Sequence, residues 1–79
     1  MEIISSAIDR IKTEKDCSAI VRTKSGIEIT MYGCITDGEV DNTSIGASFW
    51  NKKLFDSLDL KEQNDICRLV EKELSKYER

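Results

Sequence analysis

The chain has no histidine and no proline among its 79 residues. Histidine is the commonest general base and metal ligand, so its absence excludes the familiar Ser-His and Cys-His nucleophile pairs. The four glycines are scattered, and none belongs to the Gly-Lys-Ser or Gly-Lys-Thr sequence of a phosphate-binding loop. We therefore expect no enzyme, no catalytic residue and no cofactor.

Cysteine is also scarce. Cys17, Cys34 and Cys67 are odd in number and widely spaced, unlike a disulfide framework or a paired zinc knuckle. We expect all three to act as small buried hydrophobic residues, with no metal bound.

Long apolar runs are missing too. Residues 1–6 hold neither a basic leader nor a signal-length apolar segment, and no stretch of about 20 apolar residues could span a bilayer. The sequence therefore predicts a cytoplasmic protein without a membrane partner.

What is present is a globular composition, with 39% hydrophobic and 34% charged residues. The length allows one domain, 1–79, whose core would bury roughly 60% of the surface of the unfolded chain. Such a small core gives modest stability, which makes a homodimer plausible.

The net charge of −3 is unevenly distributed, because residues 36–59 hold five acids against Lys52 and Lys53. No basic stripe of the kind that binds phosphates is visible, although Arg10, Lys12 and Lys15 could form a small patch. Nucleic acid is therefore not the expected partner, and weak nucleic-acid binding ranks third among the functions considered.

Apolar residues at three- and four-residue steps predict an amphipathic helix over residues 3–15. Alternation then predicts strands over 17–23 and 27–35, joined at Lys24-Ser25-Gly26. Gly33, within the second strand, would mark a bulge or a close approach of the first helix. The helical positions are Ile3, Ile4, Ala7, Ile8 and Ile11.

Residues 36–42 have the turn-forming, acidic character of an exposed loop. Residues 43–50 alternate like a third strand, although 49–55 could equally begin a short helix. Asp59 followed by Glu62 has the form of a capping box, and apolar steps predict a helix over 60–77. On its outer side the pairs Asp65–Arg68 and Glu73–Lys76 would add slight support.

These elements predict an α+β fold: helix, strand, strand, a possible third strand, and helix. The two- or three-stranded antiparallel sheet would be covered on one face by the two helices.

Asp37, Glu39 and Asp41 alternate as the first ligands of a calcium loop do. The match fails, because Asn42 stands where the tight turn needs glycine and Ser48 where a bidentate glutamate belongs. A solvated acidic loop is one interpretation of the three carboxylates, and a contact surface for a basic partner is the other.

Aromatic residues adjoin this acidic segment. If Phe49 faces the core, strand alternation turns Trp50 outward, where a large amphipathic ring has the character of an interface hot spot. Alternatively, Trp50 covers the edge of the core. Tyr32, on the polar face of the second strand, would extend the same surface.

The order of helix, sheet and helix in a short acidic chain resembles the layout of several small phage-encoded inhibitors, anti-CRISPR proteins among them, without a shared motif. The resemblance implies a phage or mobile-element accessory protein, and it transfers no site residue.

The leading hypothesis is a small acidic protein-binding module that occupies a site on a larger, nucleic-acid-processing partner. Its expected contact residues are Asp37, Glu39, Asp41, Trp50 and Tyr32. The alternative is a self-associating structural protein whose sheet pairs with a second copy through Tyr32, Cys34 and the third strand.

Overall fold

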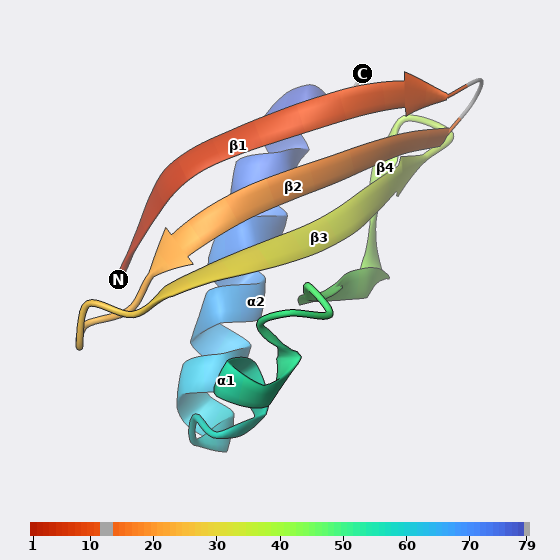
Figure 1. The fold of residues 1–79 in the computed structure, drawn as a ribbon. Coiled ribbons are helices and arrows are strands. Elements are labelled where there is room, and N and C mark those ends of the chain that lie inside the picture. Colours follow the sequence, from red (N-terminus) through yellow and green to blue (C-terminus); the bar gives the residue numbers. More distant parts are fainter. Residues whose placement is uncertain (12–13, 79) are drawn as a thin grey trace.

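The computed structural model describes the backbone of residues 1–11 and 14–78 and the side chains of residues 1–8 and 15–78. It is a small α+β domain in which a four-stranded antiparallel sheet, ordered β1-β2-β3-β4, precedes the helices (Figure 1). The elements are β1 (Glu2–Ile11), β2 (Glu14–Arg22), β3 (Glu28–Thr36), β4 (Glu39–Ala47), α1 (Lys52–Asp56), α2 (Leu60–Leu74) and a final 3-10 turn (Ser75–Tyr77).

The predicted first helix is wrong, since residues 2–11 form strand β1. β-branched isoleucines and two serines favour extended backbone over helix. A register irregularity between Ile3 and Ser5 places Ile3 opposite Val21 and Ile8 opposite Cys17. Because Val21 and Cys17 are both buried, Ile3 and Ile8 lie on the same face of the sheet although they are five residues apart. The irregularity therefore hides the two-residue alternation of a strand.

The β2–β3 hairpin agrees with the predicted strands, and its bounds differ from the expected ones by a few residues. Its partner hairpin was missed. Residues 36–42 are not a loop: β3 runs to Thr36 and β4 begins at Glu39. Only Asp37 and Gly38 lie between them, at φ values of 53° and 86°. Asp-Gly favours such a two-residue turn, because its backbone requires positive φ at both positions.

The third predicted strand, 43–50, is right in part, because residues 43–47 belong to β4 of the same sheet and residues 48–50 do not. Strand β4 ends at Ala47, and residues 49–51 form a turn that leads into the short helix α1. The alternative of a short helix within residues 49–55 is the one that the structure supports. Gln63 of α2 holds α1 in place, since its side-chain amide donates hydrogen bonds to the carbonyl oxygens of Phe55 (3.1 Å) and Leu58 (2.9 Å).

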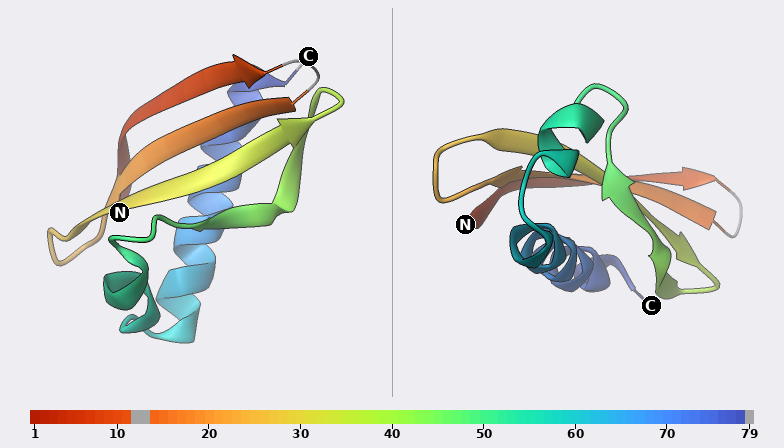
Figure 2. Two further views of the ribbon diagram at one scale, coloured as in Figure 1. Left: turned by 45° about the vertical axis from the view of Figure 1, so that its right-hand side comes forward. Right: turned by 90° about the horizontal axis from the view of Figure 1, so that it is seen from below.

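The helix predicted over 60–77 is confirmed as α2 and the 3-10 turn. Its N-cap is Asp59, whose Oδ1 accepts a hydrogen bond from the backbone N–H of Glu62 at 2.7 Å. Helix α2 lies across one face of the sheet (Figure 2). It buries Ile66, Val70 and Leu74 completely, each one helical turn after the last.

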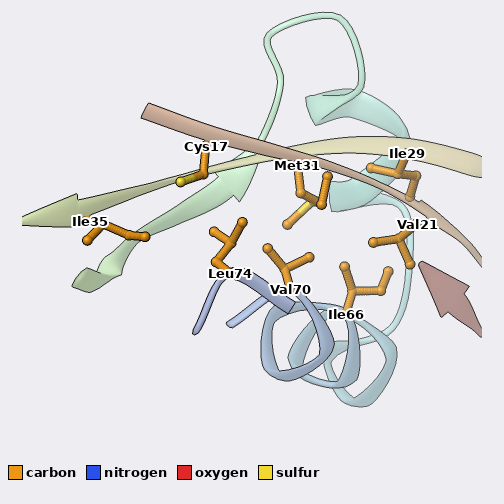
Figure 3. Packing of buried hydrophobic residues seen from close by; sticks show 9 residues of the cluster. Cys17, Val21, Ile29, Met31, Ile35, Ile66, Val70 and Leu74 are labelled. Atoms are coloured by element: carbon orange, nitrogen blue, oxygen red, sulfur yellow. The ribbon is translucent and has the colours of Figure 1, made fainter. Parts of the chain in front are cut away.

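The core between α2 and the sheet is built from alternate residues of the two central strands (Figure 3). Their side chains point at the helix, and their neighbours point away from it. This layer explains why strands β2 and β3 were predictable from alternation. Its strand residues are Cys17, Ala19, Val21, Ile29, Met31 and Ile35.

Gly33 allows a close approach of a helix to the sheet, as predicted, but the helix is α2 and not the predicted first helix. A Cβ at Gly33 would lie 2.5 Å from Leu74 Cδ1 of α2 and 3.4 Å from Ile45 Cγ1. The β3–β4 register is also irregular between Tyr32 and Cys34. Glycine therefore gives Leu74 room to reach the sheet.

Polar contacts tie the end of α2 to β1. Ser6 Oγ donates a hydrogen bond to Glu73 Oε1 at 3.0 Å and lies 2.9 Å from the Tyr77 hydroxyl. Lys76 Nζ approaches Glu73 Oε1 at 2.6 Å, which confirms one of the two predicted ion pairs. The Asp65–Arg68 pair is absent from the ion pairs of the described residues.

Hydrogen bonding by Lys76 chiefly, and also by Ser6, lowers the pKa of Glu73 below its ordinary value of 4.5, against a raising effect of desolvation. A carboxyl group whose pKa is lower in the folded than in the unfolded protein stabilises the fold at pH values above its unfolded-state pKa. This contribution is lost as the pH falls through the folded-state pKa. We expect Glu73→Gln to cost up to about 1 kcal/mol at neutral pH and nothing once Glu73 is protonated.

Urea unfolding at neutral and strongly acidic pH measures this difference. Glu71→Gln, which removes an exposed carboxylate from the same helix, is the matched control. If Glu73→Gln lowered the free energy of unfolding equally at neutral and at acidic pH, the stabilising role of the Glu73 carboxylate would be contradicted.

Within residues 1–11 and 14–78, no helix is both long and apolar enough to cross a membrane.

Candidate protein-binding surface

The sheet face opposite α2, here called the outer face, is formed by the alternate residues that point away from the core. Helix α2 lies on the other side (Figure 2). Tyr32 is the large aromatic residue at its centre and is 51% exposed. Beside it, a hollow of about 70 Å³ is lined by Ala7, Asp16, Cys17, Ser18 and Tyr32.

The residue opposite Tyr32 on β4 is Gly46. A Cβ at Gly46 would meet nothing within 4 Å, so the space next to the tyrosine ring is open. The outer face is therefore accessible around Tyr32 in the described part of the chain.

One end of the outer face is acidic. Glu39 is opposite Thr36, and Asp41 is opposite Cys34, so both carboxylates share the face of Tyr32. Asp16 pairs with Cys34 from the other side, which adds a third exposed carboxylate. Asp37, also exposed, lies at the tip of the hairpin. The predicted acidic residues thus lie on a hairpin rather than on a loop.

Asp41 is held in a fixed local geometry. Its Oδ1 accepts hydrogen bonds from the Thr43 hydroxyl at 2.6 Å and from the Thr43 backbone N–H at 3.0 Å. These two bonds, the side-chain bond first, lower the pKa of Asp41 below its ordinary value of 3.8. The group therefore carries its negative charge throughout the physiological range.

The segment from Ser48 to Asn51, here called the aromatic loop, presents two rings to solvent. Phe49 is 84% exposed and Trp50 is 86% exposed. The rings meet edge to face, with centroids 5.4 Å apart. The segment that joins β4 to α1 stands on the side of the sheet opposite α2 (Figures 2 and 3).

Hydrogen bonds connect the aromatic loop to Thr30 of β3, just beyond the end of the β3–β4 pairing. The backbone N–H of Ser48 donates to the carbonyl oxygen of Thr30 at 2.8 Å, and the N–H of Thr30 donates to Asn51 Oδ1 at 2.8 Å. The buried Ser48 hydroxyl donates to the same Asn51 oxygen at 3.3 Å. Because Thr30 is two residues before Tyr32, the loop joins the strand next to the outer face.

Two expectations about the aromatic pair need correction. Phe49 does not face the core, because the chain has left the sheet before residue 49 and alternation no longer applies. Trp50 does not cover the edge of the core, since 86% of its surface is exposed. The core closes without either ring.

Among the cysteines, Cys17 is buried, whereas Cys34 and Cys67 are half-buried. Desolvation by burial is the largest effect on the Cys17 and Cys67 thiols and raises the pKa of both above the ordinary value of 9.0. Both are therefore neutral thiols at physiological pH.

The possible basic patch cannot be placed as a unit, because Lys12 and the Arg10 side chain lie outside the described residues, while Lys15 is half-buried. Among the residues whose side chains are described, no group of three or more cysteine, aspartate and glutamate side chains could hold a metal ion. Asp41, one of the three carboxylates tested as calcium ligands, is instead bonded to Thr43.

Sequence reasoning missed Asp16 and Phe49 as members of this surface. Only the strand register could have added Asp16, since it lies twenty or more residues before the acidic hairpin. Comparisons with models of protein families, with curated proteins and with solved structures found no match to this chain.

Proposed function

We propose that the protein is a small, non-catalytic, cytoplasmic binding module that occupies a basic site on a larger protein. The observation that carries this proposal is the pair of aromatic rings, Phe49 and Trp50, held almost fully in solvent by a hydrogen-bonded loop beside an acidic sheet face. A protein of this size gains nothing in stability from such exposure, which a partner would remove.

Each part of the surface suits a different component of binding. Exposed aromatic rings that become desolvated supply most of the free energy at protein interfaces. Bonds to Thr30 hold the backbone of the aromatic loop in place, so the loop loses little conformational entropy on binding. The carboxylates of Asp16, Glu39 and Asp41 attract a basic surface and increase the association rate.

A basic groove of a nucleic-acid-processing enzyme is the partner that this combination fits best. Its phosphate-binding surface is positively charged, and an acidic, aromatic ligand would compete with nucleic acid for it. A role as a phage or mobile-element accessory inhibitor agrees with the small size and the acidity. The element order no longer supports the resemblance, because the first element is a strand.

The structure allows the acidic residues to be neutralised without altering their geometry. Asn at positions 37 and 41 tolerates the positive φ of Asp37 and retains the Oδ1 acceptor of Asp41. We expect the triple variant Asp37→Asn, Glu39→Gln, Asp41→Asn to fold normally and to bind its partner at least about tenfold more weakly at low salt. The difference should shrink as salt increases.

The measurement is affinity capture of partners from cytoplasm, followed by titration of the recovered protein with each variant. The matched control removes three exposed carboxylates elsewhere, through Asp65→Asn, Glu71→Gln and Glu78→Gln. The control variant should bind like the wild type. Equal affinity of the wild type and the hairpin variant would refute the electrostatic mechanism.

A further inference from the structure

Strand β1 forms an open edge of the sheet. It pairs with β2 alone, so its other side carries backbone N–H and C=O groups without a strand partner among the described residues. The opposite edge is different. Pairing of β4 with β3 is interrupted between Asp41 and Gly46, and the Ser44 hydroxyl accepts the Cys34 N–H there. This longer interruption, in which residues 42–45 lie outside the β3–β4 register, disfavours further strand addition at β4.

The β1 edge has little protection against strand pairing, because its register irregularity is confined to the step between Ile3 and Ser5 and its pairing with β2 is regular from Ser5 to Ile11. Residues 3–8 contain neither a charged residue nor a proline, although these are the residues that normally prevent edge association. Ile4 is 40% exposed. Ile3, Ile8 and Tyr77 pack against the core but are only partly buried, so the layer between sheet and helix is incomplete at this edge.

We propose that β1 pairs antiparallel with β1 of a second copy, so that two four-stranded sheets join into one continuous sheet. A second copy presents a strand of the same length, neutral over residues 3–8, and its own half-covered apolar layer lies on the same side of the joined sheet. Charge argues against self-association elsewhere, because facing outer faces would bring Asp16, Glu39 and Asp41 of both copies together.

This interface differs from the one expected from sequence, which used Tyr32 and Cys34. It leaves both outer faces free on the same side of the dimer, so two acidic, aromatic surfaces become available to one extended basic partner. The pairing itself does not depend on the proposed function.

Sedimentation velocity of the full chain over a micromolar concentration range tests the pairing. The wild type should sediment as twice the 9.0 kDa chain. Ile4→Lys places like charges across the two-fold axis and should raise the dimer dissociation constant about tenfold or more. Thr36→Lys adds the same charge at an exposed position of the central strand β3 and should leave the dimer intact.

Circular dichroism establishes that each variant is folded, and Ser5→Lys replaces Ile4→Lys if the latter is not. A monomeric wild type, or equal effects of the edge lysine and the Thr36 lysine, would overturn the proposal. The hairpin variant with neutralised carboxylates should remain dimeric, so failure of the basic-partner proposal and failure of the dimer are observed separately.

Discussion

Trp50→Ala is expected to weaken binding to the captured partner by about thirtyfold or more, which corresponds to about 2 kcal/mol, the threshold of an interface hot spot. The same change should alter the free energy of unfolding by no more than about 0.5 kcal/mol. The small effect on stability follows from the 86% exposure of Trp50, and the loss of affinity follows from its place in the proposed binding surface. A residue that matters for binding and not for folding identifies an interaction site.

Leu60→Ala is the matched control for this variant. Leu60 is another large hydrophobic residue, 72% exposed, and lies at the start of α2 rather than on the aromatic loop. Calorimetric titration should give the wild-type affinity for Leu60→Ala. If Trp50→Ala retained full affinity while Leu60→Ala lost it, the binding surface would have been placed on the wrong part of the molecule.

Leu74→Ala is expected to lower the free energy of unfolding by about 2–5 kcal/mol, as for other fully buried leucines. Leu74 is completely buried, and its Cδ1 occupies the space that Gly33 leaves open under the sheet. Because a small domain has a total stability of only about 5–15 kcal/mol, much of it would be lost. Urea unfolding followed by circular dichroism is the suitable measurement, since the exposed Trp50 is a poor reporter of folding.

Gly33→Ala provides the second half of this test. The added Cβ would lie 2.5 Å from Leu74 Cδ1 and should cost about 1–3 kcal/mol through overpacking. In the Leu74→Ala background the same alanine should be tolerated, which gives a clear coupling energy in a double-mutant cycle. Additive effects would mean that the two residues do not compete for this space.

Strands β2 and β3 and helix α2 could be predicted because each has one fully buried face. The alternation of Ile29, Met31 and Ile35 and the helical spacing of Ile66, Val70 and Leu74 follow directly from that burial. Strand β1 could not be predicted in the same way. Its irregular pairing near Ser5 shifts the alternation by one residue, and the resulting pattern imitates a helix.

The acidic hairpin could have been found, because the Asp37-Gly38 dipeptide favours a two-residue turn. The interpretation of residues 36–42 as an exposed acidic loop is the reason that the start of strand β4 was not predicted. The composition of the candidate surface was partly predictable, since Asp37, Glu39, Asp41, Tyr32 and Trp50 are all exposed. Their arrangement depended on a strand register that no local pattern specifies, and the exposure of Phe49 depended on where the last strand ends.

We propose that the outer face and the aromatic loop, rather than the exposed side of α2, contact the partner. The most direct measurement is an NMR titration of the ¹⁵N-labelled protein with the captured partner, which reports every backbone amide at once. We expect the largest changes at Tyr32, Gly46 and residues 48–51. Changes confined to the exposed side of α2, around Asp65, Arg68 and Lys72, would contradict it.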